Sequence, residues 1–326
     1  MQAARDALEN NQTSLYFIAV LLAGASAFAL PATAELEALI NPALAFMLFV
    51  TFLQVPVAEL GQAFTRLRFL GALLTANFIV VPLLVFALLP LMPADPLIRL
   101  GVLLVLLAPC IDYVVTFTHL GRGDARLLLA ATPALLLAQM LALPLYLNAF
   151  LGEAAAAVVQ VGPFAHAFAW LIAAPLLLAA VVQLLAGKSP PVARINSVLG
   201  LCPVPATALV LFIVVAAVGP RIETALPATL AVIPVYLAFA VAAPLLGWWV
   251  ARCWLQAPAA GRAVAFSSAT RNSLVVLPLG LAVPGALAVL PAVIITQTLV
   301  ELLSELVYVR VLPRLGATSA GTLADQ

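Results

Sequence analysis

Charged residues are scarce in this chain. Aspartate, glutamate, lysine and arginine make up 8% of its 326 residues, whereas a typical soluble domain has about 25%. Hydrophobic residues make up 65%, and the mean hydropathy is +1.20. This composition excludes a soluble globular protein and predicts a helical protein that crosses a membrane several times.

Signatures of catalysis and metal binding are also missing. The three cysteines, Cys110, Cys202 and Cys253, lie far apart and form no CxxC pair. There is no glycine-rich phosphate loop, nucleophilic triad or metal-ligand cluster. We therefore expect no enzymatic activity, no cofactor, no bound metal and no nucleic-acid partner. Any coupling of transport would have to come from an ion gradient or a substrate gradient.

Ten apolar stretches are long enough to span a bilayer, which takes about 20 helical residues each. Eleven of the 14 basic residues fall on one side of these spans, two fall on the other side, and Arg271 lies within a span. This asymmetry predicts a multi-pass protein of the inner (plasma) membrane with both termini in the cytoplasm. The approximate spans are 14–32, 38–57, 69–91, 98–119, 125–149, 164–187, 199–218, 226–251, 263–283 and 286–312.

The two halves of the chain look like an internal repeat. Pro133 is followed six residues later by Gln139, and Pro291 is followed six residues later by Gln297. Five spans in each half would make the second half enter from the opposite side, which is a transporter architecture. The expected organisation is a first five-helix repeat at 1–151, a linker at 152–162, a second inverted repeat at 163–314 and a cytoplasmic tail at 315–326.

Two spans at corresponding places in this repeat are interrupted by polar residues or proline. The fourth span contains Pro109–Cys110–Ile111–Asp112, and the ninth is polar at every position of 267–273 except Ala269. Irregular backbone at membrane depth is tolerated only where it is buried in protein or lines a cavity. We therefore expect an all-α membrane protein in which discontinuous helices four and nine cross at a transport site. A polar packing seam is the alternative.

Four ionisable residues lie inside spans, where each needs a partner. Asp112 and Arg271 are predicted to pair at the crossing, either as a structural salt bridge or as a gate that opens on protonation or ligand binding. Glu301 and Glu305 share one face of the tenth span. Glu301 is predicted to be a proton or substrate relay, or else a hydrogen-bonded buried acid. Glu305 is predicted to be a solvated carboxylate.

Other polar residues within the spans are candidate site residues. Cys110 is either a small buried residue or a soft ligand for a thiophilic substrate. The predicted cavity-lining residues are Asn77, Gln139, Ser267, Ser268, Thr270, Ser273 and Gln297.

The segments at 108–111, 118–124 and 299–301 resemble those of the arsenite efflux permeases, a branch of the bile acid/sodium symporter superfamily. This resemblance implies that Cys110 contacts the substrate and that Glu301 is the essential carboxylate of the last span. It also implies that Arg271 and Asn272 occupy the place of a substrate-binding Asn–Asn pair.

The chain also departs from these relatives. Pro109 stands where the permeases have an arginine, and Leu274 stands where they have a glutamate. In the sodium symporters a Glu and a Gln of the ninth span coordinate sodium, and the matching positions here are Ser267 and Arg271. A fixed guanidinium at such a position argues against sodium, so we expect coupling to protons or no coupling.

These features predict a secondary transporter that exports arsenite or antimonite by proton antiport. The alternative is a carrier of small organic anions, in which Arg271 binds the substrate carboxylate. A membrane sensor is a third interpretation. The expected partners are a small-molecule or oxyanion substrate, protons rather than sodium, and the lipid bilayer. Whether the protein forms a homodimer is left open.

Overall fold

The computed structural model describes most of the chain, and every regular element in the described part is a helix, as predicted. Asp112, the predicted linker 152–162 and most of the predicted tail lie outside the described residues. The described residues are 5, 7–9, 11–29, 31–54, 66–111, 113–151, 166–255, 257–283, 285–286 and 289–316.

The described residues of each predicted span are largely helical, as one helix, as a run of consecutive helical segments, or as two helices on either side of a break. The segments in chain order are α2 (Gln12–Ala29), η1 (Pro31–Leu36), α3 (Glu37–Phe52), α5 (Leu67–Thr75), η3 (Ala76–Val80), α6 (Val81–Leu88), η4 (Leu89–Leu91), α7 (Pro96–Leu106), α8 (Val114–Leu120), α9 (Ala125–Leu151), η5 (Phe168–Ala173), α12 (Ala174–Ala186), α13 (Pro190–Leu199), α14 (Pro203–Val218), η6 (Gly219–Arg221), α15 (Ile222–Trp254), α16 (Pro258–Ala269), α17 (Ser273–Leu281), α18 (Val289–Val311) and η7 (Leu312–Arg314).

Length and composition make six of the described helical stretches candidate membrane spans. Helices α13 and α14, bent by 46° at their junction, form a seventh if they are counted as one span. The chain is therefore a multi-pass helical protein, whereas the arrangement of ten spans in two inverted repeats stays a prediction. Helix α13 lies in a region predicted to be a loop between spans.

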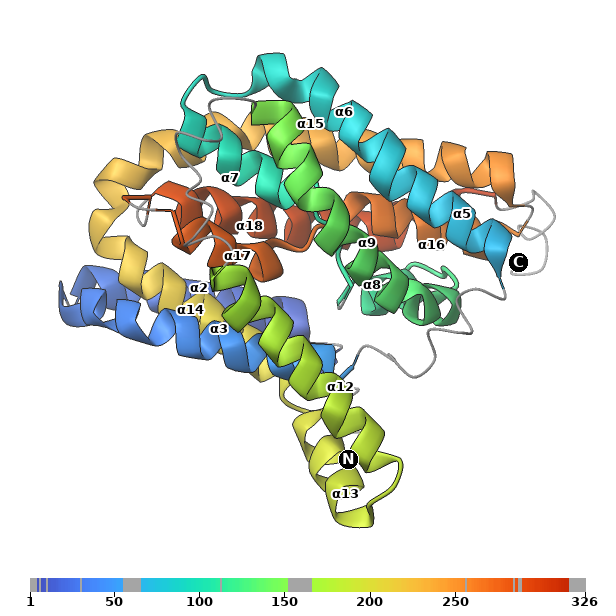
Figure 1. The fold of residues 1–326 in the computed structure, drawn as a ribbon. Coiled ribbons are helices and arrows are strands. Elements are labelled where there is room, and N and C mark those ends of the chain that lie inside the picture. The colour runs from blue at the N-terminus through green and yellow to red at the C-terminus, as the bar shows by residue number, and fades with distance from the viewer. Residues whose placement is uncertain are drawn as a thin grey trace, which may run out of the picture.

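The helices form two groups that lie side by side (Figure 1). We call α2, α3, α12 and α14 the flanking layer, because α14 packs on α2 and α3 while α12 packs on α3. We call the helices α5–α9 and α15–α18 the central group. In it α15 packs against α16 and α18, and α18 packs against α7 and α17. The two groups meet where α14 contacts α18 and α3 contacts α17.

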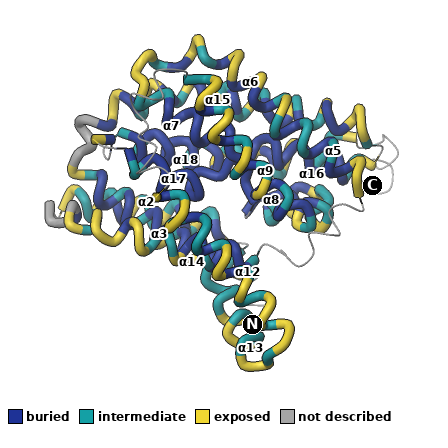
Figure 2. Tube along the Cα trace, viewed as in Figure 1, coloured by how far each residue is buried: buried dark blue, intermediate teal, exposed yellow. Residues whose placement is uncertain are grey.

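Burial differs sharply within the molecule (Figure 2). Residues 100–106 of α7 and 273–280 of α17 are buried along their whole length. Helix α12 instead exposes large apolar side chains such as Leu177 and Leu184. Exposed leucines on a long apolar helix are expected to face lipid, so the short broken helices occupy the protein interior.

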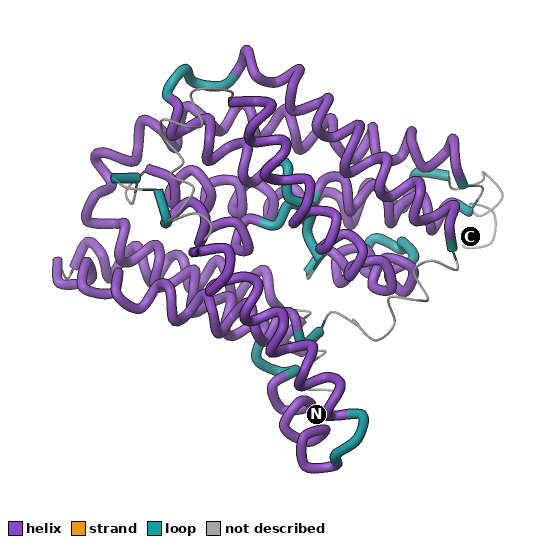
Figure 3. Tube along the Cα trace, in the orientation of Figure 1, coloured by secondary structure: helices purple, strands orange, loops and turns teal. Residues whose placement is uncertain are grey.

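Both interruptions predicted from the sequence are present, and loop segments lie in the middle of the helical body (Figure 3). The first separates α7 from α8, and the second separates α16 from α17. Pro109 lies in the first break, and its missing N–H prevents continuation of the helical hydrogen-bond ladder.

Two π-helical turns lie within the spans, at Ala76–Val80 and Phe168–Ala173. The hydroxyl of Tyr146 donates a 2.5 Å hydrogen bond to the carbonyl of Phe78 in the first turn. Single π-helical turns often occur at functional sites. The first turn carries Asn77, which contacts the crossing, and the second carries Trp170, which lines a pocket.

Candidate functional site

The two helix breaks meet in the protein interior and satisfy each other's backbone groups. Pro109 and Arg271 form an isolated antiparallel bridge. The N–H of Cys110 donates to the carbonyl of Thr270 (3.0 Å), and the N–H of Asn272 donates to the carbonyl of Ala108 (2.7 Å). Unpaired backbone groups at membrane depth would cost several kcal/mol each, so each break stabilises the other. We call this junction the crossing.

Arg271 is fully buried at the crossing. One terminal nitrogen, Nη2, donates to Oδ1 of Asn77 (2.8 Å) and to the carbonyl of Ser267, and Nη1 lies 3.4 Å from the carbonyl of Leu106. The guanidinium carbon lies 5.5 Å from the centre of the Phe239 ring, within cation–π range. All three oxygen partners are uncharged. The guanidinium therefore occupies a small pocket lined by neutral oxygen atoms.

The predicted partner of Arg271, Asp112, lies outside the described residues, so their pairing stays a prediction. Within the described part of the chain, no carboxylate oxygen forms an ion pair with the guanidinium. Its Nε atom also has no hydrogen-bond partner there.

Glu301 links both breaks to α18. Its Oε1 atom accepts a 2.6 Å hydrogen bond from the hydroxyl of Tyr113, just before α8. Its Oε2 atom accepts 2.6 Å bonds from the backbone N–H of Arg271 and from Nε2 of Gln297. Gln297 in turn accepts a hydrogen bond from the hydroxyl of Ser273. Three donors converge on this one carboxyl group.

The prediction that Glu305 is a solvated carboxylate is wrong, because its side chain is fully buried. Helix α18 packs against α15, and Tyr308, about one turn after Glu305, donates to the carbonyl of Ala240 on α15, so a position near the end of a span does not place the residue in water. Oε1 of Glu305 lies 2.6 Å from the hydroxyl oxygen of Thr270. Oε2 has no hydrogen-bond partner among the described residues.

Most other predicted site residues lie in the crossing itself and are buried there. Cys110 has no exposed surface, and Asn272 has only 3%. The hydroxyl of Ser267 accepts a 3.0 Å bond from Asn77, whereas that of Ser268 donates back to the carbonyl of Val264 in its own helix. Gln139 lies apart from the crossing, in a small apolar pocket with Leu143, Val275 and other side chains.

Tyr113 is the residue that reasoning from the sequence missed. Its hydroxyl donates to Glu301, and its side chain also lines a small pocket between the flanking layer and the central group. The sequence offered one signal for this residue, because a phenol at a helix break within an apolar span needs a polar partner for its hydroxyl. We call this cavity the polar pocket; its lining residues are Glu9, Gln12, Tyr16, Thr51, Gln54, Tyr113, Thr116, Pro203, Val204 and Thr207.

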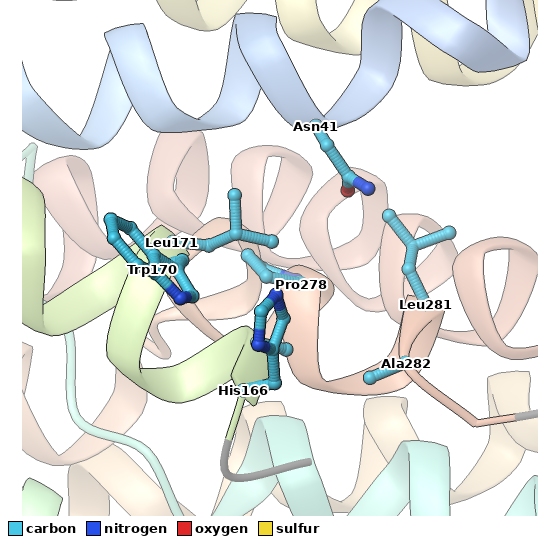
Figure 4. Close-up of a pocket in the computed structure, with 8 residues that line it drawn as sticks. Asn41, His166, Trp170, Leu171, Pro278, Leu281 and Ala282 are labelled. Carbon is cyan, nitrogen blue, oxygen red and sulfur yellow. The ribbon is translucent and has the colours of Figure 1, made fainter. Parts of the chain in front are cut away.

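A larger pocket of about 570 Å³ lies near the other end of α3 (Figure 4). Asn41 of α3 points toward α17, and His166 and Trp170 form the facing wall. The other lining residues are Ala167, Leu171, Pro278, Leu281 and Ala282.

Both pockets are lined in part by α3. Asn41 and Thr51, which line the larger and the polar pocket respectively, lie about 15 Å apart along α3 at 1.5 Å per residue. Between them Leu44, Met47 and Leu48 are at most 2% exposed. The two pockets are therefore separate cavities along α3, with buried apolar side chains of this helix between them.

Residues 41–227, more than half of the chain, match the Sodium Bile acid symporter family. No curated protein shows a detectable match to the chain.

Proposed function

Because the chain belongs to the Sodium Bile acid symporter family and is a multi-pass membrane transporter of that type, we propose that it exports a small uncharged oxyacid, such as arsenite or antimonite, in exchange for protons. One observation carries this proposal. The hydroxyl of Tyr113 connects the polar pocket to the buried carboxyl group of Glu301.

The proton step uses the hydrogen bonds of Glu301. The N–H of Arg271 and Nε2 of Gln297 can only donate, and the Tyr113 hydroxyl, which also lies 3.3 Å from the carbonyl of Arg271, donates to Glu301 at the shorter distance of 2.6 Å. A proton bound at Oε1 would turn that atom into a donor, so the phenol of Tyr113 would have to accept the bond or move away. Tyr113 lies at the first break and Glu301 on α18, so protonation changes a contact between two elements of the crossing.

Arg271 supports a mechanism without sodium at the crossing. Its guanidinium occupies a pocket of neutral oxygens, the type of ligand that alkali cations use in proteins. A guanidinium stays charged under all physiological conditions and cannot leave the protein. We therefore assign to Arg271 the role of a fixed cation that occupies this place and removes the need for a soluble one.

The lining of the polar pocket favours a neutral substrate over an organic anion. Among the described residues that line it, several offer hydroxyl or carboxamide groups, one is the carboxylate Glu9, and none is basic. The two Nη atoms of Arg271 are bonded to protein oxygens and the whole side chain is buried, so it does not reach a substrate carboxylate in this conformation. Cys110 does not line this pocket, and its thiol would reach a substrate only if the two breaks separated.

Transport by the purified protein in liposomes tests the proposal. We expect a pH gradient to drive arsenite or antimonite transport, with the same rate in sodium and in potassium salts. Removing the phenol with Tyr113→Phe should lower the rate by roughly tenfold, the effect of one hydrogen bond to a charged group. Tyr146→Phe is the matched control, since its hydroxyl contacts the backbone carbonyl of Phe78 and not Glu301.

Glu301→Gln should abolish the response to the pH gradient while leaving the carrier folded. Transport that requires sodium, or uptake of small carboxylates in preference to arsenite, would contradict the proposal.

A further inference from the structure

Helix α18 carries a second buried carboxyl group, which the proposed function does not use. Glu305 follows Glu301 by one helical turn and is fully buried. The titratable groups that interact with it are Glu301 and Tyr308 on its own helix, and Tyr308 in turn interacts with Arg271 at the second break. The hydroxyl of Tyr308 donates to the carbonyl of Ala240 on α15. Among the described residues, no basic side chain forms an ion pair with Glu305.

The hydroxyl of Thr270 has two short contacts but only one hydrogen atom. Its oxygen lies 2.8 Å from the carbonyl oxygen of Phe266 and 2.6 Å from Oε1 of Glu305. A carbonyl oxygen can only accept. If the hydroxyl donates to Phe266, the hydrogen in the contact with Glu305 must belong to the carboxyl group of Glu305.

The other assignment of the hydrogen is unfavourable. Thr270 would then donate to an ionised Glu305, and the 2.8 Å contact with Phe266 would contain no hydrogen. The second oxygen of that carboxylate would lie buried without any donor among the described residues. Burying an uncompensated charge costs more free energy than one hydroxyl hydrogen bond contributes.

The two neighbouring acids have opposite surroundings. Three donors point at Glu301, whereas Glu305 has one hydroxyl partner and one oxygen without a partner. Residues four apart on a helix lie about 5–6 Å apart at Cβ, so two negative charges there would repel each other. Paired carboxyl groups with contrasting environments divide into one acid and one carboxylate.

We propose that Glu305 is a second proton-binding site, which holds a proton in this conformation while Glu301 is ionised. Thr270 connects this site to the crossing, because its carbonyl accepts the backbone hydrogen bond of Cys110 at the first break. When Glu305 loses its proton, the Thr270 hydroxyl must change from hydrogen-bond acceptor to donor in its contact with Glu305. This change takes place next to the backbone bond between Thr270 and Cys110. The part that Glu305 plays in transport rests on the proposed function, whereas its protonation state does not.

Infrared spectroscopy of the purified protein in lipid membranes tests the protonation state. At neutral pH we expect a carbonyl stretching band of a protonated carboxylic acid, lost in Glu305→Gln and retained in Glu301→Gln. In Thr270→Val the band should move to higher frequency, because the acid loses its hydrogen-bond acceptor. Gln is neutral and of the same size, so the melting temperature of Glu305→Gln should stay near that of the wild type.

Two results would overturn the proposal: no such band in the wild type, or a band that persists in Glu305→Gln. If Glu305→Gln does not fold, Thr270→Val is the deciding variant. An unchanged band in Thr270→Val would show that the protonated acid does not bond to Thr270, which would overturn the proposal. In liposomes, Glu305→Gln should weaken transport driven by a pH gradient while substrate exchange without a gradient continues. A wild type that transports nothing would refute the proposed function and leave the infrared result standing.

Discussion

The two helix breaks form the same backbone contacts but contribute different side chains. At the first break, Pro109 has no N–H, and the side chain of Cys110 is fully buried. At the second break, Thr270 and Arg271 reach α18 and η3 with side-chain hydrogen bonds, and Ser273, the first residue of α17, reaches α18. Among the described residues, the side chains of the second break therefore make bonds to α18 and η3 at Thr270, Arg271 and Ser273.

This difference teaches that two chain segments with matching positions need not share the chemistry of a site. The first break opens a gap between two helix ends, and the phenol of Tyr113 extends from it to Glu301. The second break supplies the cation and the hydroxyl group that contacts Glu305. Substitutions at the second break should therefore have the larger effects.

Replacing Arg271 should have the largest effect. Arg271→Met leaves three buried oxygens without this donor, those of Asn77, Ser267 and Leu106. Each unsatisfied buried acceptor costs about 1–3 kcal/mol, so we expect a loss of several kcal/mol, measured as a lower midpoint of thermal unfolding in detergent. Arg271→Lys should be intermediate, because an ammonium keeps the charge but lacks the planar fork.

Arg310→Met is the control for this substitution, since the Arg310 guanidinium is bonded only to a carbonyl of its own helix and is exposed. If the oxygen pocket attracts cations, sodium chloride should raise the melting temperature of Arg271→Met above that in choline chloride, and the wild type should show no difference. Equal stability of Arg271→Met and wild type would show that the hydrogen bonds of Arg271 do not stabilise the second break.

Replacing Gln297 should have the next largest effect. Gln297→Leu removes one donor from Glu301 and the acceptor for the hydroxyl of Ser273. We expect a loss of about 2–4 kcal/mol from these two buried groups. Thr298→Val is the neighbouring control, because the Thr298 hydroxyl makes only a long, 3.4 Å bond within its own helix. Similar melting temperatures for the two variants would argue against the Glu301 network.

Replacing Cys110 should change stability less, because the backbone bond of this residue remains. We expect Cys110→Ala to cost about 1–2 kcal/mol through lost packing. The effect of Cys110→Ala on arsenite transport tests whether the first break also has a chemical role. Loss of transport in a stable Cys110→Ala protein would show that it has one. Cys202→Ala is the control thiol, at the partly exposed end of α14.

The smallest effect is expected for Pro109→Ala. The hydrogen bonds that join the two breaks use the neighbouring residues, Ala108 and Cys110, so they survive. A change below about 1 kcal/mol is expected, mainly through greater freedom of the unfolded chain. Thermal unfolding measures it, and a loss as large as that for Arg271→Met would mean that the proline itself maintains the break.

The sequence was sufficient to predict the helical class, both breaks and the burial of Glu301. Each follows from a local property: apolar length, proline or a polar run, and a charge in an apolar helix. Contacts between distant segments could not be predicted in this way. Asn77 and Ser267 are 190 residues apart in the chain, and Tyr113 and Glu301 are 188 apart. The burial of Glu305 depends on the packing of α15 and α16 against α18, which no local pattern reveals.

The positions of the charges at the crossing also match the electric fields of the broken helices. Leu106 is the last residue of α7 and Ser267 lies in the last turn of α16, so the guanidinium of Arg271 binds carbonyls at two negative helix ends. The carboxyl group of Glu301 instead accepts the N–H of Arg271, next to the positive end of α17. Each such arrangement contributes about 0.3–2 kcal/mol, depending on burial. Because these charges are buried, dissolved salt screens them little, and the crossing should keep its stability over a wide range of ionic strength.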